Sequence, residues 1–495
     1  MIQLLEQAKQ FTNRIALSDD KEELTYRELT LRSDVFAAIL LGDVADLNEE
    51  RIAFFVPPSC TYTIVQWGIW KAGGIAVPLC TQHPTEALLY VLRDIQCKRL
   101  ITLGMSASLL NELQENLDLI IIDLANFTFS KDSKKELPQI DLDRRSMILY
   151  TSGTTNQPKG VVSTHRNIQA QISTLVMAWK WHAEDSILNV LPLHHVHGII
   201  NIMSCALWVG AKCHFLPKFD AGKVWSLFAS GSINVFMAVP TIYYKLIAHW
   251  DEVSPPEQNI WSKATRSFRL MISGSAALPV SVLEKWKIIT GHTLLERYGM
   301  TEIGMALSNP YDGERRPGHV GQALPEVQIR TVNETGVPIP REESGELEIK
   351  GPAVFKEYWQ KPQATAAAFT SDGWFKTGDV GIYKNGYYRL LGRTSVDIIK
   401  SGGYKISALE IEEVIRRFPG IKDCAVVGIE DEEWGQIIGA ALICTPSSID
   451  VDQLITWSKD YLPAYKLPRR FIYLDDLPKN TIGKVTKKEV VKLFN

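Results

Sequence analysis

The stretch 151-TSGTTNQPKG-160 is the part of the sequence that decides the fold. It is framed by SMILY (146–150) and VVST (161–164), which have the length and apolar content of short buried strands. The stretch itself holds hydroxyl side chains, two glycines and Lys159, so it predicts a loop held at both ends. Small residues let a ligand approach the backbone N–H groups, and the lysine adds positive charge. Together these features suit a polyphosphate.

Outward from this loop, short Val/Ile-rich runs alternate with amphipathic segments up to about residue 310. Examples are RIAFFVP (51–57) before TYTIVQWGIWKAG (61–73), and INVFMAVP (233–240) before TIYYKLIAHW (241–250). Such alternation predicts strand–helix units and largely parallel sheets. From about residue 315 to 392, closely spaced strands and glycine turns, as in KNGYYRLLG (384–392), predict a small β subdomain.

A new pattern begins after GRTSVDIIKSGGYK (392–405). Ser407 and Glu410 form an S-x-x-E capping box ahead of the helical pattern LEIEEVIRRF (409–418), and strand-like runs follow. We therefore expect an α/β protein with a large N-terminal domain of parallel-rich sheets, residues 1–392, which includes the β subdomain at 315–392. A small α+β C-terminal domain, residues 393–495, should follow.

Composition places the chain in the ordinary globular class. With 495 residues, 45% of them hydrophobic, it is too long for one compact core. A net charge of −3 provides no overall attraction to nucleic acid or to an anionic membrane, so an anionic ligand must meet a local cluster of cations. The seven cysteines are odd in number and lack CxxC spacing, which argues against a disulfide framework or a zinc site and favours a reducing compartment.

The most apolar stretch, GIINIMSCALWVGA (198–211), falls short of the ~18 residues needed to cross a bilayer and predicts a buried helix. The N-terminal residues carry Glu6 and no long apolar run, so a secretory signal is not expected. These features favour a cytoplasmic location, with an organelle matrix as the alternative if the N-terminus is trimmed.

Four further motifs follow the loop in a fixed order: ERYGMTE (296–302), GWFKTGDVG (373–381), GRTSVDIIKSGGYK (392–405) and PKNTIGKVTK (478–487). An ordinary P-loop is disfavoured, because Lys159 precedes Gly160 instead of following it. Over its whole length the chain resembles the adenylate-forming superfamily of acyl-CoA synthetases, luciferases and peptide-synthetase adenylation domains. LPLHHVHG (191–198), LMISGSAALP (270–279) and the YGMTE region are most similar to malonyl-CoA synthetases.

The resemblance implies two half-reactions and a small, mobile C-terminal domain. In the first, malonate and ATP give malonyl-AMP and pyrophosphate; in the second, the thiol of coenzyme A displaces AMP. The implied ligands are malonate, ATP, Mg²⁺ and coenzyme A. The sequence suggests no nucleic acid, no membrane span and no obligate protein partner. Methylmalonate or a short monocarboxylate remains the alternative acid.

The resemblance also assigns roles to individual residues. The β- and γ-phosphates would be held by Thr151, Ser152, Gly153, Thr154, Thr155 and Lys159. The nucleotide site would include Tyr298 against adenine, Gly299 and Met300 beside it, Thr301 on the α-phosphate, Glu302 on Mg²⁺, Asp379 on the ribose hydroxyls, and Arg393 on ribose or phosphate. Coenzyme A would be met by Ser401, Gly402, Gly403 and Tyr404.

Lys484 has a role with a clear physical motive. The carboxylate nucleophile and the α-phosphate repel each other, so a cation between them lowers the barrier. The resemblance further implies that the small domain rotates after adenylation and withdraws Lys484. One extra residue before SGG leaves Ser395, Val396 and Asp397 all open as the pivot.

The substrate is predicted from Arg297. A guanidinium at this position, which borders the acyl site in the superfamily, is costly to bury without an anion. The second carboxylate of a short diacid would supply that anion, and His197, Ser273 and Lys245 are candidate helpers. If Arg297 instead pairs internally, with Glu296 or another acidic group, a short monocarboxylate or a bulkier acid becomes the better substrate. A nucleotide-binding regulator without catalysis and an adenylation domain that loads a carrier protein in trans are the remaining alternatives.

Overall fold

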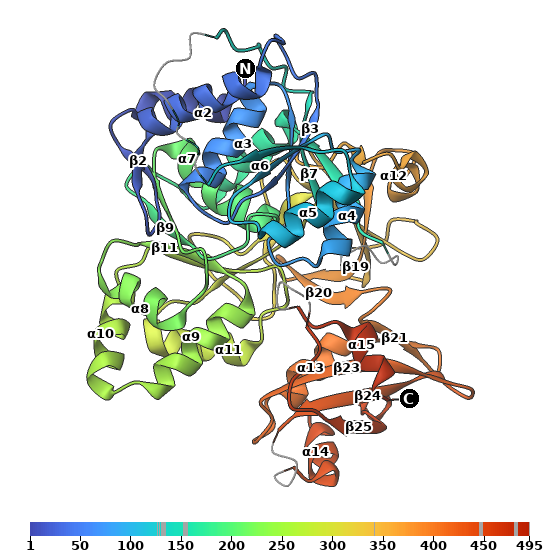
Figure 1. Cartoon of the computed structure of the whole chain (residues 1–495). Helices are drawn as coiled ribbons and strands as arrows, with labels where there is room; N and C mark the ends of the chain where they lie inside the picture. Colours follow the sequence, from blue (N-terminus) through green and yellow to red (C-terminus); the bar gives the residue numbers. More distant parts are fainter. Residues whose placement is uncertain are drawn as a thin grey trace.

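The computed structural model describes residues 1–125, 127, 129, 135–151, 157–340, 342–444, 449–479 and 484–494. The chain has the expected α/β fold. Its N-terminal part is built on two large sheets and one small antiparallel sheet, and its C-terminal part has a sheet of its own (Figure 1). The C-terminal part lies beneath β20 (Tyr387–Arg393), and its Glu413 Oε2 accepts from Val280 N, at the start of α11 (Val280–Thr290), at 3.4 Å.

Parallel pairing dominates the larger sheet, as the alternation of strands and helices predicts. The pairs from β1 through to β13 are parallel, and antiparallel strands lie only at the two edges of the described sheet. In spatial order its nine strands are β15 (Gln322–Ala323), β14 (Gly304–Ser308), β13 (Leu295–Met300), β12 (Leu270–Ser273), β11 (Val235–Ala238), β9 (Ser186–Asn189), β10 (Lys212–Phe215), β1 (Ile15–Ser18) and β2 (Glu23–Thr25).

The second large sheet has the same character. Its parallel strands run from β7 to β6, and β8 and β18 add an antiparallel edge. In spatial order its seven strands are β18 (Glu357–Tyr358), β8 (Lys159–Thr164), β7 (Arg145–Thr151), β4 (Ile75–Pro78), β3 (Arg51–Phe55), β5 (Arg99–Thr102) and β6 (Ile120–Asp123).

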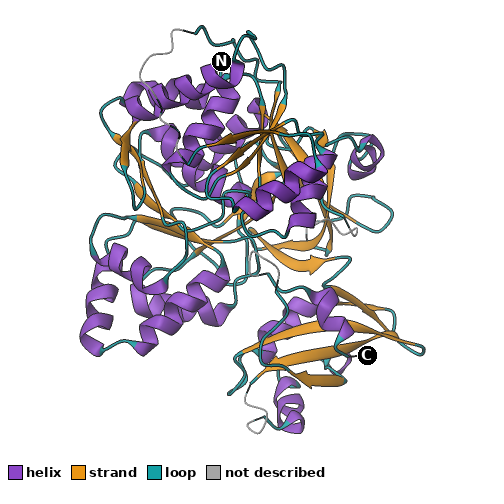
Figure 2. Cartoon of the chain, in the orientation of Figure 1, coloured by secondary structure: helices purple, strands orange, loops and turns teal. Residues whose placement is uncertain are grey.

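Both faces of the second sheet are buried. Along β3, Ile52 and Phe54 join the main core cluster with residues of α2, α3 and α6, while Ala53 and Phe55 join a separate cluster with α4 and α5. The main cluster also contains strands of the nine-stranded sheet, so α2, α3 and α6 lie between the two sheets (Figure 2). Burial on both faces explains why these strands read as continuous apolar runs.

Most α-helices of the N-terminal part fall into three groups, whereas α12 packs against the small antiparallel sheet. The first group, α8 to α11, forms the green lobe at the lower left of Figure 1, the second packs between the sheets, and α4 and α5 cover the outer face. Their bounds are α1 (Gln3–Ala8), η1 (Lys9–Phe11), α2 (Tyr26–Leu41), α3 (Cys60–Lys71), α4 (Thr85–Asp94), α5 (Ala107–Asn116), α6 (His165–Ala178), α8 (Ala221–Ala229), α9 (Pro240–Glu252), α10 (Pro255–Thr265), α11 (Val280–Thr290) and α12 (Pro362–Ala368).

The predicted buried helix at 198–211 is present in two parts. It begins as a π-helix, η2 (His197–Ser204), and continues as α7 (Cys205–Val209) until Gly210 turns the chain with φ 82°. A π-helical turn widens the backbone and is frequent at functional sites. It places His197 at the start of the buried segment. Within the described residues, the structure contains no helix of the length and apolar character that a bilayer span requires.

The predicted β subdomain is a four-stranded antiparallel sheet: β16 (Gln328–Val332), β17 (Gly345–Lys350), β19 (Phe375–Lys384) and β20 (Tyr387–Arg393). Asn385 and Gly386 both have positive φ, so the β19–β20 turn has the geometry that an Asn-Gly pair favours. The C-terminal part contains β21 (Ile398–Ser401), β22 (Tyr404–Ser407), α13 (Ala408–Ile415), β23 (Asp423–Asp431), β24 (Gly435–Ile443), α14 (Val451–Ser458), η4 (Ala464–Lys466), β25 (Arg470–Tyr473) and α15 (Lys487–Lys492).

Two apolar clusters of the C-terminal part contain only residues beyond 398. The division into domains 1–392 and 393–495 stays a prediction. The predicted capping box at the first helix of the C-terminal part is half formed. Ser407 Oγ accepts from Glu410 N at 3.2 Å, but the Glu410 carboxylate lies 2.7 Å from Lys466 Nζ, because a nearby cation attracts it more strongly than a backbone N–H. All seven cysteines are free thiols.

Candidate active site

The loop 151–160 closes an antiparallel hairpin, as the sequence predicts. β7 ends at Thr151, β8 begins at Lys159, and these two residues are partners in the pairing. The Lys159 ammonium lies 5.0 Å from the centre of the Tyr358 ring, which is within cation–π range. The remaining predicted phosphate ligands lie outside the described residues: Ser152, Gly153, Thr154 and Thr155.

Tyr358 connects Lys159 with Glu302, the predicted Mg²⁺ ligand. The Tyr358 hydroxyl donates to Glu302 Oε1 at 3.0 Å. Burial raises the pKa of Glu302, so a cation is needed to favour its ionised form. No group of three or more His, Cys, Asp or Glu side chains that could hold a metal ion occurs among the described residues. Binding of Mg²⁺ by Glu302, shared with phosphate oxygens, stays a prediction. This ligand set suits a hard cation.

A buried polar group lies beside this pair and contains three predicted nucleotide ligands. Asp379 on β19 and Arg393 on β20 are partners in the strand pairing, and Arg393 Nε donates to Asp379 Oδ1 at 2.9 Å. Tyr298 donates its hydroxyl to Asp379 Oδ2 at 2.7 Å, and Asp379 N donates to Thr377 Oγ1 at 3.0 Å. The carboxylate is therefore held in one orientation, as recognition of a ribose diol requires. The stacking of Tyr298 on adenine stays a prediction.

The turn after β13 positions the reacting end of the nucleotide site. β13 ends at Met300 and β14 begins at Gly304, so Thr301 and Glu302 occupy the tight connection between two antiparallel strands. A Cβ atom on Gly299 would lie 2.1 Å from the Gly304 carbonyl oxygen, which only glycine avoids. Gly299 therefore allows β13 and β14 to approach closely, and the tight turn between them holds Thr301 and Glu302 near the end of the strand that carries Tyr298.

The second site is a polar group that we call the Arg297 cluster: the buried Arg297 and His197, with the exposed Ser275 in hydrogen-bond contact with both. The Arg297 guanidinium is buried, and its Nη2 donates to Ser275 Oγ at 3.4 Å. Its Nε has no hydrogen-bond partner among the described residues. A Cβ atom on Gly274 would lie 2.5 Å from Arg297 Nε, so the glycine makes room for the guanidinium.

Arg297 has no acidic partner within the described residues, and burial lowers its pKa to about 9. Glu296, the internal partner that would favour a monocarboxylate, is adjacent on β13 and therefore points to the opposite face. Glu296 Oε1 accepts from Leu278 N at 3.2 Å, and burial raises the pKa of Glu296 to about 8. A buried guanidinium without a counter-ion is the arrangement that an anionic ligand would complete.

Two neighbours complete the Arg297 cluster. Ser275 Oγ accepts from Arg297, so its own hydrogen is available to His197 Nδ1 at 3.3 Å. This arrangement favours the neutral tautomer of His197 with the proton on Nε2, an atom that is buried and without a partner in the described chain. Ser273, another predicted helper, pairs with Glu296 in the register of β12 and β13, so its side chain lies on the Glu296 face, opposite to Arg297, and its role toward the acid stays a prediction. Ser275 has φ 71°, an uncommon conformation for serine that occurs mostly at functional sites.

Lys245, the third predicted helper, lies elsewhere. It is exposed on α9, where its Nζ is 5.9 Å from the centre of the Phe219 ring. It contributes to lowering the pKa of Asp476 in the C-terminal part, after the larger effect of Lys479. No described contact joins Lys245 to the Arg297 cluster, and its role toward the acid stays a prediction.

The predicted coenzyme A loop is a two-residue hairpin turn. Ser401 and Tyr404 are partners at the ends of β21 and β22, and Gly402 and Gly403 between them have φ 54° and 82°. Gly402 N donates to the Trp434 carbonyl at 2.9 Å. Tyr404 is 56% exposed, and its ring stacks on Tyr465 at 4.5 Å. The loop thus presents a rigid backbone and an exposed aromatic surface.

Lys484 lies after residues 480–483, which are outside the described part of the chain. The ends of this segment are held together by a bridge between Lys479 and Val485 and by Thr486 N donating to the Pro478 carbonyl at 2.8 Å. The sequence analysis missed Tyr358, because its approach to Glu302 depends on the pairing of β18 with β8 and has no local signal.

The raised pKa of Glu296 predicts a pH-dependent stability. Between the ordinary carboxyl pKa and about 8, the folded protein binds one more proton than the unfolded chain, so stability falls as pH rises through this window. Glu296→Gln removes the titration and keeps the bond from Leu278. Relative to the unsubstituted protein, its Tm should rise by about 3 °C or more between pH 5 and pH 8. Glu252→Gln, on an exposed helix end, is the control, and parallel pH profiles would contradict the assignment.

Sequence profiles of known families match both parts of the chain. The AMP-binding enzyme family matches residues 4–359, and the AMP-binding enzyme C-terminal domain matches residues 410–484. The chain is 44% identical in sequence to malonate–CoA ligase ACSF3, mitochondrial, of Xenopus laevis. The alignment covers 100% of this chain and 92% of the Xenopus laevis chain.

Solved structures agree with these matches. ATP-bound MatB from Rhodopseudomonas palustris is similar with a TM-score of 0.90 and 32% identity, over 100% of this chain and 99% of its own. Apo MatB from the same organism has a TM-score of 0.80 and 31% identity over the same shares of the two chains. The arrangement of this chain is therefore nearer to the ATP-bound form. The family match covers more than half of the sequence and the relatives span its full length, so the chain belongs to the AMP-binding enzyme family.

Proposed function

We propose that this protein is an ATP-dependent malonate–CoA ligase that forms malonyl-CoA, AMP and pyrophosphate. The observation that carries the proposal is the buried Arg297 guanidinium, which has no acidic partner among the described residues. The relative from Xenopus laevis bears the name malonate–CoA ligase, in agreement with this substrate. A diacid fits because one carboxylate can pair with Arg297 while the other reacts.

The nucleotide-binding residues support the first half-reaction. Asp379 would accept from the ribose hydroxyls, and Lys159 would meet the β- and γ-phosphates with the loop that it ends. Mg²⁺ bound through Glu302 would neutralise phosphate charge. Thr301, in the turn beside Glu302, would donate to the α-phosphate.

In adenylation, an oxygen of the reacting carboxylate attacks the α-phosphorus of ATP. The new O–P bond gives malonyl-AMP, and the bond to the β-phosphate oxygen breaks to release pyrophosphate. Lys484 would lie between the two anions and offset their repulsion as charge develops on the α-phosphate. Arg297 would hold the other carboxylate and so fix the direction of the acid.

In thioester formation, the sulfur of coenzyme A attacks the carbonyl carbon of malonyl-AMP, and AMP leaves with the bonding electron pair. The loop Ser401–Tyr404 would contact coenzyme A. This role requires the small domain, which we place from Arg393 onward, to turn relative to residues 1–392 and to withdraw Lys484. Ser395, Val396 and Asp397 remain the candidates for the pivot.

The acid preference can be tested by pyrophosphate release with ATP, Mg²⁺, coenzyme A and a set of acids. We expect kcat/KM for malonate to exceed that for acetate, propionate and butyrate by about three orders of magnitude, because a monocarboxylate leaves Arg297 unpaired. Methylmalonate, which keeps both carboxylates, is the closest competitor. A monocarboxylate that equals malonate would contradict the proposed substrate while leaving adenylation intact.

For the location of the protein we keep the cytoplasmic prediction, with an organelle matrix as the alternative. The Xenopus laevis relative carries the word mitochondrial in its name, which favours the alternative. Imaging of the full-length protein fused to a fluorescent reporter at its C-terminus distinguishes the two locations.

A further inference from the structure

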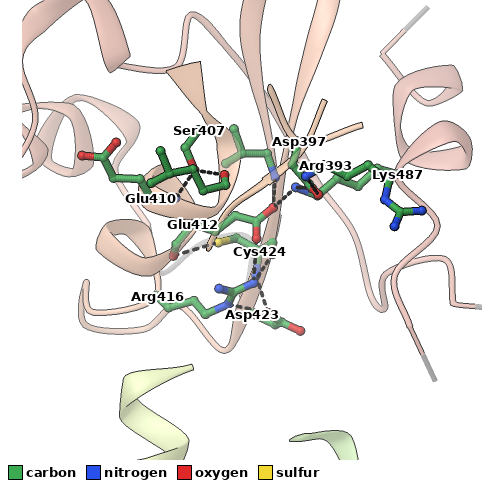
Figure 3. A network of polar contacts seen from close by, with 11 residues as sticks. Arg393, Asp397, Ser407, Glu410, Glu412, Arg416, Asp423, Cys424 and Lys487 are labelled. Carbon is green, nitrogen blue, oxygen red and sulfur yellow. Dashed lines mark hydrogen bonds and ion pairs between the residues drawn. The ribbon is translucent and has the colours of Figure 1, made fainter. Parts of the chain in front are cut away.

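Lys487, the first residue of α15, is a buried lysine three positions after Lys484. Its side chain is 8% exposed, and its Nζ lies 2.7 Å from Asp397 Oδ1 and 2.7 Å from Glu412 Oε1 (Figure 3). Burial alone would lower the pKa of Lys487, but Glu412 and Asp397 raise it above the ordinary value. The lysine is thus a charged link between two carboxylates from distant segments.

Asp397 connects Lys487 to Arg393, at the start of the small domain, through hydrogen bonds with the Arg393 backbone. Asp397 Oδ2 accepts from Arg393 N at 3.0 Å, and Asp397 N donates to the Arg393 carbonyl at 2.7 Å. A Cβ atom on Gly392 would lie 2.3 Å from Asp397 Cβ, so the turn after β20 closes tightly on this aspartate. Because the Arg393 guanidinium binds Asp379, the polar contacts continue from Lys487 to the nucleotide site.

Glu412 ties the same lysine to the core of the small domain. Its Oε1 accepts from Val426 N at 2.9 Å, and its Oε2 accepts from Arg416 Nη2 at 3.2 Å. Arg416 is anchored in turn by Asp423 and by the Cys424 carbonyl (Figure 3). Glu412 therefore has a fixed position on α13, against β23.

The segment that carries Lys484 leads directly into α15. The bridge between Lys479 and Val485 and the bond from Thr486 N to Pro478 close the segment on itself. Val490 and Phe494 anchor the far end of α15 in an apolar cluster. Burial opposes the ionisation of Asp397, but Lys487 and, to a lesser extent, Lys484 bring its pKa below the ordinary value, so Lys484 lies within electrostatic reach of the link.

We propose that Lys487 is a positioning residue for adenylation, an inference that rests on the proposed function. By joining Asp397 and Glu412 it fixes the chain three residues from Lys484 relative to Arg393, and thereby relative to the nucleotide. Three residues span at most about 10 Å, so a loosened Lys487 displaces Lys484 directly. The coenzyme A turn, Gly402 and Gly403, is held by the pairing of β21 with β22 and by the bond from Gly402 N to the Trp434 carbonyl, and no described contact joins it to Lys487.

Lys487→Met tests the proposal by measuring the two half-reactions separately. We expect kcat for malonate-dependent pyrophosphate release to fall by about 30-fold or more, with KM for ATP and malonate within about twofold. Conversion of supplied malonyl-AMP and coenzyme A to thioester should stay within about twofold of the unsubstituted protein. Lys487→Arg keeps the charge and should recover most of the adenylation rate.

Arg416→Met is the matched control, because Arg416 is a cation on the same Glu412, with its side chain 18% exposed, and none of its described contacts reaches the Lys484 segment. It should lower Tm to a similar extent without a selective loss of adenylation. If Lys487→Met slows both half-reactions equally, as a purely structural lysine would, or leaves adenylation unchanged, the positioning role is overturned.

A second variant covers the case in which Lys487→Met does not fold. Asp397→Asn with Lys487→Met removes both charges of one pair and leaves no unpaired carboxylate there, so its adenylation should show the same selective loss. If the unsubstituted protein itself releases no pyrophosphate with malonate, the proposed function fails, and that result is distinct from failure of the positioning role.

Discussion

Replacing Arg297 by alanine should lower kcat/KM for malonate by about three orders of magnitude, which corresponds to roughly 4 kcal/mol of transition-state stabilisation. The substitution removes the buried cation that would pair with the far carboxylate. Tyr298 is adjacent to Arg297 on β13 but points to the opposite face, and Lys159, Asp379 and Arg393 lie on other strands. KM for ATP, measured with saturating malonate, should therefore stay within about twofold. Pyrophosphate release at varied malonate and ATP concentrations gives both values.

Two further variants separate charge from packing. Arg297→Leu restores most of the lost volume without the charge, so butyrate should become a better substrate than it is for the unsubstituted protein, because no guanidinium is left unpaired. Arg315→Ala removes a half-buried arginine, which donates to the carbonyls of Thr293 and Tyr311 and is not in the Arg297 cluster. It should lower Tm and keep the malonate preference. Full malonate activity in Arg297→Ala would exclude the diacid site.

The parts of the fold that could be predicted are those in which the local pattern of apolar residues indicates which segments are buried. Apolar runs such as residues 51–57 are buried on both faces, and this is why they indicated parallel strands. The sequence did not indicate which strands pair across long separations, as β1 does with β10 and β18 with β8. Such pairings depend on the packing of whole layers, so a local pattern contains no signal for them.

The candidate site divides in the same way. Tyr298, Asp379 and Arg393 were predicted from motifs, and they lie together because strand register aligns Asp379 with Arg393. The unusual φ of Ser275 and the π-helical start at His197 were not predictable, since neither position carries glycine or another local marker. The capping box at Ser407 was half wrong because the competing cation, Lys466, is distant in sequence.

The electrostatic pattern of the N-terminal part explains how a nearly neutral protein can bind several anions. Glu348 is paired with Arg330 and Asp185 with Arg269, so these buried charges are locally neutralised. Arg297 differs because no described carboxylate faces it. A buried charge without a partner destabilises the folded chain, and a ligand carboxylate would remove that penalty on binding. Malonate should therefore also raise the Tm of the protein.

Lys484→Ala should separate the two half-reactions more sharply than any other single substitution. Without the ammonium group between the carboxylate and the α-phosphate, pyrophosphate release with malonate should fall by about 10³-fold. The second half-reaction requires the small domain in its other orientation, with Lys484 withdrawn, so supplied malonyl-AMP should still react with coenzyme A at a rate within about threefold of the unsubstituted protein. Single-turnover thioester formation, followed by chromatography, measures this step.

Lys479→Ala is the matched control, since Lys479 lies in the same motif and its ammonium pairs with Asp476 at 2.6 Å. It should leave both half-reactions within about twofold. If Lys484→Ala slows thioester formation from malonyl-AMP as much as it slows adenylation, the two steps share one arrangement of the small domain. In that case Lys484 acts on both reactions from a single position, and rotation of the domain beginning near Arg393 is not required for turnover.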